Sequence, residues 1–280
     1  MINNSKNQNK NNNKKSFFNK KHNFSKQNER YESKLDGFYI TGKNVVIEAI
    51  KSKTQIDEII ICDEYQDNFY NQIENIENYK DKIKILDSDR FYNLASKITH
   101  NKEQKIIAKI KNYEYHTPMD CIEYARSKGE KPFLILLDEI TDPMNFGSII
   151  RSANQAGVHG IIIKEKNSCE INNIVANASS GAVFYTKVAK VTNLSRTIEE
   201  LKKEGMWFAC SDMDGENMYS ANLDLPLGIV IGSEGSGVSR LVREKCDYVV
   251  SIPMYGNIDS LNASVSAAIL MYEVVRRCKF

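Results

Sequence analysis

Three polar segments in the second half of the chain hold the residue types that could bind and transform a small molecule. Each follows a short apolar run and leads into a helix-like pattern. Because the carboxyl ends of parallel strands meet at one edge of a sheet, we expect the segments to gather where open α/β sheets place their ligand site. They are segment one (residues 142–151), segment two (232–239) and segment three (252–264).

Segment two begins with GSEGSG at residues 232–237, which has the spacing G-x-x-G-x-G. No lysine follows the last glycine, which excludes a P-loop, and the spacing does not fit a dinucleotide-binding turn. The glycines let backbone amides approach a ligand closely, whereas the carboxylate of Glu234 would repel a pyrophosphate. The segment therefore favours a neutral or cationic ligand. The alternative is a plain turn with a solvated glutamate.

Segment one combines turn-forming residues with the start of a helix. Asp138, Asp142 and Pro143 predict a non-helical turn, and Asn145 is placed to cap the helix that follows. Arg151 then lies within two helical turns of this cap. The alternative is a capped helix that carries an ordinary surface arginine.

Segment three ends where Asn262 opens a helix that continues to Arg277. Apolar residues cover a broad arc of this helix: Ala263, Ala267, Ala268, Leu270, Met271 and Val274. A buried closing helix would explain the pattern. The arc also exceeds what one helix face needs for its own core, so we expect a homodimer through the C-terminal domain.

The order and content of these segments resemble the SpoU branch of the knotted RNA methyltransferases. The resemblance implies that S-adenosylmethionine donates a methyl group to a ribose 2′-hydroxyl of RNA. It implies an α/β protein in which a small N-terminal α/β RNA-binding domain precedes a C-terminal parallel-sheet methyltransferase domain. That second domain would contain a trefoil knot, a feature otherwise nearly absent from proteins. The resemblance assigns catalysis to Asn145, Arg151, Glu234 and Asn262, and cofactor binding to Gly232, Ile252, Met254, Leu261 and Ser180.

Residues 177–182 match a Ser-Gly-Ala turn of the same family, and this match places Ser180 in the predicted cofactor site. Asn177 is a further candidate for contact with the cofactor or RNA. A helix end followed by a turn at Gly181 explains the segment equally well.

Residues 37–49 resemble the opening of the family's substrate-binding domain. Lys43 and Asn44 lie there at a strand-to-helix turn, a place suited to phosphate contacts. With Arg151 they form the expected RNA-binding set. An ordinary solvated helix N-terminus is the alternative for both residues.

Charge is distributed unevenly along the chain. Residues 1–34 hold nine Lys/Arg and two Glu, a charge of +7, whereas the whole chain carries +2 and the remainder therefore −5. Because a negatively charged body repels phosphate, any RNA site on it must be a local basic patch.

The six cysteines show no C-x-x-C spacing, and several lie in apolar runs where a thiol acts as a small hydrophobe. We therefore expect neither a metal site nor a disulfide. The N-terminal residues lack the apolar core of a signal peptide, and no run approaches the roughly 18 apolar residues of a membrane span. These features predict a reduced, cytoplasmic protein without a membrane partner.

The composition divides the chain into four parts. Residues 1–35 are an Asn/Lys-rich tail with too little apolar surface to fold, although its lysines and phenylalanines could contact RNA. Residues 36–112 alternate strands and helices and predict a three-layer RNA-binding domain. Residues 113–131 form a linker with a short helix at 119–127, and residues 132–280 form the methyltransferase domain.

Periodicity predicts the elements within the two domains. The first has expected strands at 38–40, 56–61, 83–86 and 104–110 and expected helices near 45–50, at 68–79 and at 89–98. In the second domain, near-continuous apolar runs are typical of a parallel sheet covered on both faces. Its expected strands are 133–137, 160–163, 183–191, 207–210, 229–231 and 248–252.

The resemblance covers residues 37–277 and favours guanosine in large-subunit ribosomal RNA as the target. The alternatives are a tRNA 2′-O-methyltransferase and a non-catalytic RNA-binding protein of ribosome assembly. Because an arginine is effectively always protonated, we prefer a role for Arg151 in orienting a phosphate and stabilising the developing alkoxide. A general-base role for Arg151 remains the other interpretation.

Overall fold

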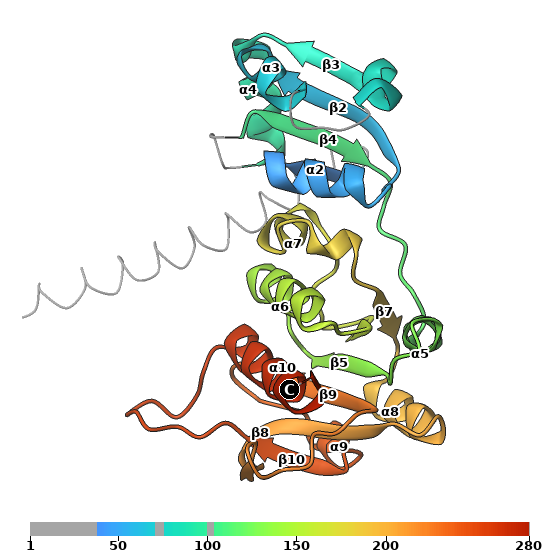
Figure 1. Ribbon diagram of the computed structural model, residues 1–280. Coiled ribbons are helices and arrows are strands. Elements are labelled where there is room, and N and C mark those ends of the chain that lie inside the picture. Colours follow the sequence, from blue (N-terminus) through green and yellow to red (C-terminus); the bar gives the residue numbers. More distant parts are fainter. Residues whose placement is uncertain (1–37, 71–75, 100–103, 280) are drawn as a thin grey trace, which may run out of the picture.

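The computed structural model describes residues 38–70, 76–99 and 104–279, which form two β-sheets arranged along the long axis of the molecule (Figure 1). The predicted tail at residues 1–35 lies outside the described residues. The N-terminal sheet has the strand order β1-β4-β2-β3, and only the β2–β3 pair is parallel. Its strands are β1 (Phe38–Thr41), β2 (Ile56–Cys62), β3 (Ile83–Leu86) and β4 (Ile106–Ile110).

Helices cover both faces of the N-terminal sheet. One face packs against α2, which buries Val45, Val46 and Ala49, and the other packs against α4 through Phe91 and Ala95. The predicted helix at 68–79 is not a single α-helix, because its described parts are a short α-helix and a 3₁₀ segment. The helical elements are α2 (Lys43–Lys51), η1 (Asp63–Tyr65), α3 (Gln66–Tyr70), η2 (Ile76–Lys82) and α4 (Ser88–Ile98).

The C-terminal sheet is entirely parallel, with the strand order β10-β8-β9-β5-β6-β7. This confirms the expected α/β class. Alternate residues of the central strand β5 enter two different hydrophobic clusters, as expected for a strand buried on both faces. The strands are β5 (Phe133–Asp138), β6 (Gly160–Lys164), β7 (Val188–Val191), β8 (Trp207–Asn217), β9 (Leu227–Gly232) and β10 (Tyr248–Ser251).

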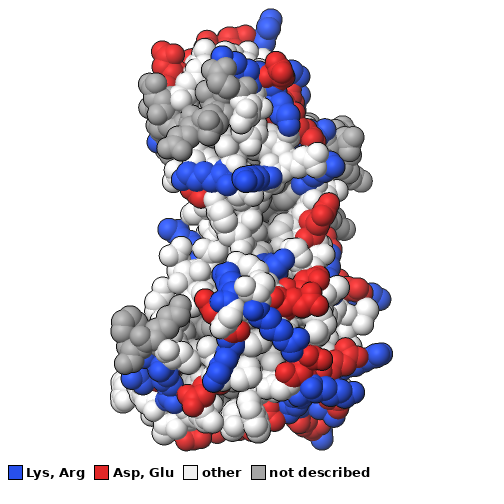
Figure 2. Space-filling view, turned by 45° about the vertical axis from the view of Figure 1, so that its right-hand side comes forward, with Lys and Arg blue, Asp and Glu red and all other residues white. Residues whose placement is uncertain are grey.

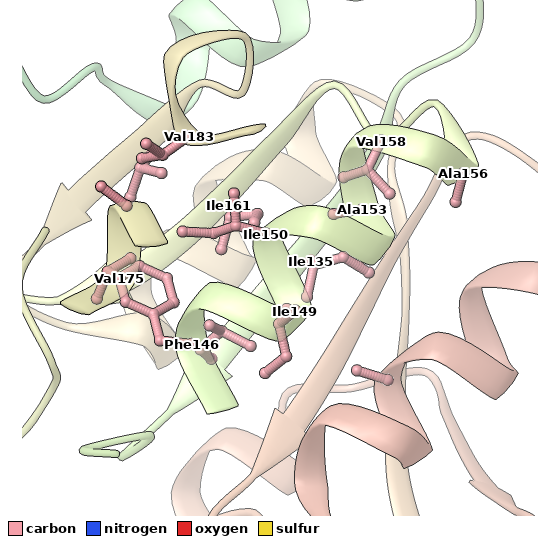
Figure 3. Close-up of a cluster of buried hydrophobic side chains, with 14 of the residues drawn as sticks. Ile135, Phe146, Ile149, Ile150, Ala153, Ala156, Val158, Ile161, Val175 and Val183 are labelled. Atoms are coloured by element: carbon pink, nitrogen blue, oxygen red, sulfur yellow. The ribbon is translucent and has the colours of Figure 1, made fainter. Parts of the chain in front are cut away.

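Helix α6 lies on one face of this sheet, where Ile150 lies beside Ile161 of β6 and Phe146 lies beside Val175 of α7 (Figure 3). Helices α7 and α10 pack beside α6, and α5, α8 and α9 supply the cluster on the opposite face. The helices are α5 (Pro118–Ser127), α6 (Pro143–Ala156), α7 (Asn173–Ala178), η3 (Ala182–Phe184), α8 (Leu194–Lys203), α9 (Arg240–Arg243) and α10 (Ala263–Lys279).

Two predicted strands have different limits in the structure. The expected strand at 183–191 begins only at Val188, because the chain first forms the 3₁₀ turn η3, which Thr186 closes by donating to the Ala182 carbonyl at 2.9 Å. The expected strand at 207–210 continues as β8 to Asn217. Its pairing with β10 shifts from Cys210 to Glu216, so residues 211–215 bulge out of the sheet.

Hydrogen bonds from Arg243 of α9 stabilise the bulge. The Arg243 guanidinium donates to Asp212 Oδ2 at 2.8 Å and to Asp214 Oδ1 at 2.8 Å. These hydrogen bonds from Arg243 lower the pKa of Asp214. An added Cβ at Gly215 would lie 2.6 Å from the β10 backbone, so only glycine allows the bulge to return this close to the strand.

The two sheets are joined by packing as well as by the connecting chain. One continuous hydrophobic cluster includes residues of α2, β1, α6 and α7, and α7 lies between the sheets (Figure 1). Asn177 Nδ2 donates to Thr41 Oγ1 at 3.0 Å, and the Tyr185 hydroxyl donates to Glu48 Oε2 at 2.8 Å. An added Cβ at Gly181 would lie 2.7 Å from Glu48 Cβ, which shows how closely the two parts approach.

None of the helices in the described residues is long and apolar enough to cross a membrane. On the face shown in Figure 2, basic and acidic side chains are interspersed over the lower part of the molecule, and the waist between the two parts is largely uncharged. That face carries no broad field of one sign.

Candidate active site

Three side chains from the three segments meet at the carboxyl edge of the C-terminal sheet. Asn145 Nδ2 donates to Glu234 Oε1 at 2.9 Å, and Asn262 Nδ2 donates to the same oxygen at 2.5 Å. Asn262 Nδ2 also lies 2.8 Å from Asn145 Oδ1. The parallel sheet thus brings together residues that are 89 and 117 positions apart in the sequence.

The orientation of Asn262 is fixed by the helix that follows it. Its Oδ1 accepts the Ser264 amide at 2.9 Å, the Ser264 hydroxyl at 2.6 Å and the Val265 amide at 3.4 Å, so Asn262 caps α10. With its oxygen engaged in the cap, the amide nitrogen is directed toward Glu234.

The N-terminal cap of α6 is a different residue from the predicted Asn145, and this difference positions the Asn145 side chain. Asp142, not Asn145, caps α6: its Oδ2 accepts the Asn145 amide at 3.0 Å and its Oδ1 accepts the Met144 amide at 3.4 Å. Pro143 occupies the first helical position, where proline is favoured, and this moves the cap to the preceding residue. Asn145 therefore lies inside the first turn, and its side chain is free to reach Glu234.

A cavity of about 280 Å³ lies beside Glu234, between segment two, segment three and the bulge of β8. Its volume lies just below the range of roughly 300–1,000 Å³ that is typical of small-molecule sites. Its lining combines apolar side chains with exposed backbone of the glycine-rich turn. The apolar lining residues are Met213, Ile231, Ile252, Met254, Leu261 and Ala263.

The charged residues that line this cavity are all acidic. Glu234, Asp259 and Asp212 all border it, and Asp212 is paired with Arg243. Carboxylates that face a ligand disfavour phosphate and favour a positive charge. The site therefore suits a ligand that has an apolar ring system and a cationic centre.

Comparison with known proteins identifies the family. The sequence profile of the SpoU rRNA methylase family matches residues 132–272, half of the chain. The chain belongs to the SpoU rRNA methylase family. A second profile, described as RNA 2′-O ribose methyltransferase substrate binding, matches residues 39–116. The expected family and the expected enzyme class, an RNA methyltransferase, are thereby confirmed.

Relatives of similar length support this membership. The chain is 39% identical over 240 residues to YacO of Bacillus subtilis, named as a TrmH family tRNA/rRNA methyltransferase, with 85% of this chain and 95% of YacO covered. It is 39% identical over 245 residues to a Staphylococcus haemolyticus protein with the same family name, with 87% and 97% covered.

Solved structures with the same fold are more distant in sequence. An RNA methyltransferase of the TrmH family from Porphyromonas gingivalis has a TM-score of 0.69 at 22% identity, with 86% of this chain and 90% of that chain covered. AviRb, a SpoU methyltransferase from Streptomyces viridochromogenes solved in complex with AdoMet, has a TM-score of 0.68 at 22% identity, with 86% and 89% covered. These similarities show the SpoU fold.

Most of the predicted SpoU site residues are brought together. Asn145, Glu234 and Asn262 contact one another. The predicted cofactor residues Gly232, Ile252, Met254 and Leu261 all line the cavity beside them.

Ser180 does not line this cavity. It follows α7 with a φ of 51° and precedes Gly181, which packs against Glu48 and Val45 of α2. The structure therefore places the Ser-Gly-Ala turn at the contact between the two sheets, as it does Asn177, the other candidate in that segment.

Arg151 also lies apart from the cavity, on the exposed side of α6. It lies six positions after Asn145, which corresponds to about 9 Å along the helix axis and about 120° around it. Seven arginines of the described residues form ion pairs. The Arg151 side chain forms neither an ion pair nor a hydrogen bond with any described residue. Its guanidinium is therefore available to an external anion.

Lys43 and Asn44 are both exposed in the first turn of α2, on the N-terminal unit. Neither residue lines the cavity at the C-terminal sheet. Gly42 precedes them with a φ of 94°, so the backbone turns sharply from β1 into the helix and leaves both side chains at the surface.

Sequence patterns did not identify the residues that the bulge of β8 contributes to the cavity, namely Ser211, Asp212 and Met213. These residues have the polar composition that is typical of a loop, and they match no known motif. The acidic Asp259 could have been identified, because it lies within segment three directly before Ser260.

The residues that the structure describes contain no group of three or more His, Cys, Asp or Glu side chains that could hold a metal ion.

Proposed function

We propose that the chain transfers a methyl group from S-adenosylmethionine to a ribose 2′-hydroxyl of RNA. The observation that carries the proposal is the contact of Asn145, Glu234 and Asn262 beside a cavity with an acidic lining. Membership of the SpoU family and the AdoMet complex of AviRb support it.

The lining of the cavity fits this cofactor. Ile252, Met254 and Leu261 offer apolar contact to an adenine ring. The backbone of segment two can approach the cofactor closely because its turn is rich in glycine. Glu234 and Asp259 supply negative charge for the sulfonium and amino groups. When bound, S-adenosylmethionine supplies an electrophilic methyl group.

The residues of the chain have positioning and electrostatic tasks. Two amide donors hold the Glu234 carboxylate in one orientation, so its charge does not have to reorganise during the reaction. The 2′-oxygen must approach the methyl carbon in line with the bond that breaks, and a fixed ligand geometry makes this approach efficient.

We propose that Arg151 binds an RNA phosphate and stabilises charge that develops on the 2′-oxygen. Its distance along α6 from Asn145 and its lack of an ion pair within the described residues support a role toward RNA. A planar guanidinium offers two parallel donors to a phosphate and remains protonated, which argues against its acting as a general base.

The favoured target is ribosomal RNA, with guanosine of the large subunit as the specific expectation. The substrate-binding profile at residues 39–116 and the rRNA description of the family support an rRNA target. The names of the relatives include both tRNA and rRNA, so a tRNA target is the second candidate. Lys43 and Asn44 are proposed RNA contacts of the N-terminal unit.

We also propose the domain limits 36–112 and 132–280 with a linker at 113–131, a trefoil knot and a homodimer. Membership of the SpoU family, whose resemblance implies a knotted domain, supports the knot. Exposed apolar residues support the dimer: Val265 and Tyr272 on α10, and Tyr255 and Ile258 on the loop before it, which projects from the body in Figure 1. Sedimentation at micromolar concentration should give a dimer, and a fully active monomer would contradict it.

The function is tested with purified protein and two measurements. Titration calorimetry should show binding of S-adenosylmethionine that is unchanged by a chelator. Radiolabelled methyl transfer to ribosomal RNA and to tRNA, followed by mapping of alkali-resistant linkages, should identify the substrate. Transfer to tRNA alone would establish the second candidate, and absence of cofactor binding would leave the non-catalytic RNA-binding alternative.

A further inference from the structure

A buried carboxylate lies between segments one and two. Asp138 is the last residue of β5 and has only 1% of its surface exposed. Its backbone is paired in register with Gly232, the first residue of segment two. Asp138 is not part of the cavity lining, and the contacts of Asn145, Glu234 and Asn262 do not involve it.

The two oxygens of this carboxylate have different partners. Oδ2 accepts the backbone amide of Ser239 at 2.8 Å, and Oδ1 lies 3.1 Å from Lys164 Nζ at the end of β6. Lys164 Nζ donates a hydrogen bond to Glu139 Oε1 at 2.8 Å, whereas its contact with Asp138 Oδ1 is an ion pair. Because an isolated buried charge is unfavourable, the lysine and the amide together allow the carboxylate to remain buried.

These contacts fasten both ends of segment two to one residue. The Asp138 backbone pairs with Gly232 at the start of the segment, and its side chain holds Ser239 at the end. Within the segment, the Gly237 amide donates to the Ser233 carbonyl at 2.9 Å, and an added Cβ at Gly232 would lie 2.0 Å from the Gly237 carbonyl carbon. The segment is therefore a loop closed at its base, with Glu234 near its tip.

The chain turns sharply directly after Asp138. Glu139 has a φ of 63°, in the left-handed region that non-glycine residues rarely adopt. Strained backbone of this kind persists only where surrounding contacts determine it. The contacts of Asp138 and Lys164 with their neighbours provide such constraints.

We propose that Asp138 is a positioning residue, held by Lys164, that fixes segment two in the conformation that binds the cofactor and presents Glu234 to Asn145 and Asn262. The cofactor part of this inference rests on the proposed function. The part that concerns the conformation of segment two does not.

The chain offers a matched control for this carboxylate. Asp247 also accepts a backbone amide, that of Phe208 at 2.9 Å, and also pairs with a lysine, Lys202 at 2.6 Å. Phe208 is the second residue of β8, so this contact lies at the amino edge of the sheet, opposite the cavity. Loss of a stabilising carboxylate should lower the free energy of unfolding in both Asp138→Ala and Asp247→Ala, although Asp247 is less deeply buried. Loss of positioning should change segment two only in Asp138→Ala.

The experiment measures amide hydrogen exchange of the ligand-free protein and cofactor affinity by titration calorimetry. In Asp138→Ala, we expect exchange at residues 233–239 to accelerate by about tenfold or more, and the dissociation constant for S-adenosylmethionine to rise by about tenfold or more. In Asp247→Ala, both quantities should stay within about twofold of the wild type. Asp138→Asn retains an oxygen that can accept the Ser239 amide and should restore most of the affinity.

Equal effects of Asp138→Ala and Asp247→Ala, or unchanged exchange in Asp138→Ala, would overturn the proposal. If Asp138→Ala does not fold, the wild type still provides a test, because the Ser239 amide should exchange about a hundredfold more slowly than the Gly235 amide. Similar rates at the two amides would also overturn it. A wild type that does not bind S-adenosylmethionine would refute the proposed function and leave the exchange comparison valid.

Discussion

Asn262 has two functions that substitutions can separate. Its Oδ1 caps α10, and its Nδ2 donates to Glu234 and Asn145. Asn262→Ala removes both functions. Asn262→Ser keeps a good capping group but removes the amide donor. We expect both variants to transfer methyl groups more slowly and only Asn262→Ala to lose stability.

The magnitudes follow from the contacts. Loss of a cap lowers the free energy of unfolding by about 0.5–2 kcal/mol. At about 2–4 °C per kcal/mol for a domain of this size, Asn262→Ala should melt roughly 1–8 °C lower. A hydrogen bond to a carboxylate contributes about 1.5 kcal/mol, the lower end of the range for charged partners, because this site is open to solvent. Loss of that interaction in the transition state slows transfer about tenfold.

The assay combines thermal unfolding with single-turnover methyl transfer at saturating RNA and cofactor. Asn262→Asp serves as a third variant, because it can cap α10 but places a second carboxylate against Glu234, and it should transfer methyl groups more slowly than Asn262→Ser. A wild-type rate in Asn262→Ser would remove the amide donor from the mechanism. Equal melting temperatures of the Ala variant and the wild type would refute the cap.

Three further predictions concern other parts of the chain. Arg151→Ala should leave cofactor affinity nearly unchanged but reduce single-turnover methyl transfer severely, and Arg151→Lys should restore little because an ammonium lacks the two-pronged donor geometry; a near wild-type rate in the Ala variant would refute this role. Gly181→Ala should lower the melting temperature, because Gly181 has a φ of 85° and faces Glu48. It should not change the affinity for the cofactor. A large loss of affinity would indicate that the segment with Ser180 contributes to the cofactor site. Hydrogen bonds from Arg276, aided by Arg277, lower the pKa of Glu273 from 4.5 to about 2. Since the folded pKa is depressed, Glu273 stabilises the protein above about pH 4.5 and loses this contribution as the pH falls toward 2. Glu273→Gln should therefore have a lower free energy of unfolding than the wild type at pH 7, by on the order of 2–3 kcal/mol. The difference in stability between the two proteins should shrink in acid titrations followed by circular dichroism.

The sequence predicted the sheet and the meeting of the three segments because both depend on simple patterns. Buried parallel strands need continuous apolar runs, and their carboxyl ends share one edge. Contact of Asn145 with Glu234 therefore follows once both are assigned to turns after such strands. The contact between these two side chains was therefore predictable without knowing any side-chain rotamer.

The helix cap was predicted wrongly because two signals compete in segment one. Asn145 is a good capping residue, but Pro143 prefers the first helical position and moves the cap to Asp142. The sequence contained this information, since proline one position after an aspartate is itself a helix-start signal.

Other features depend on tertiary contacts that periodicity does not report. Residues 211–215 leave the sheet because Arg243 holds Asp212 and Asp214, and Arg243 lies about 30 positions away in the sequence. The Ser-Gly-Ala turn packs against Glu48, which is more than 130 residues earlier. No local pattern could have identified either contact.

The position of Arg151 outside the cavity is consistent with the electrostatics of the whole chain. An arginine beside Glu234 would pair with that carboxylate, as Arg243 pairs with Asp212 and Asp214, and would no longer be available to a phosphate. On the outer side of α6, Arg151 has no ion pair among the described residues. A chain whose residues 35–280 carry a net charge of −5 has to attract RNA through such unpaired cations. If the proposed function holds, separation of the acidic cavity from Arg151 lets the domain bind a cationic cofactor and an anionic RNA at different places.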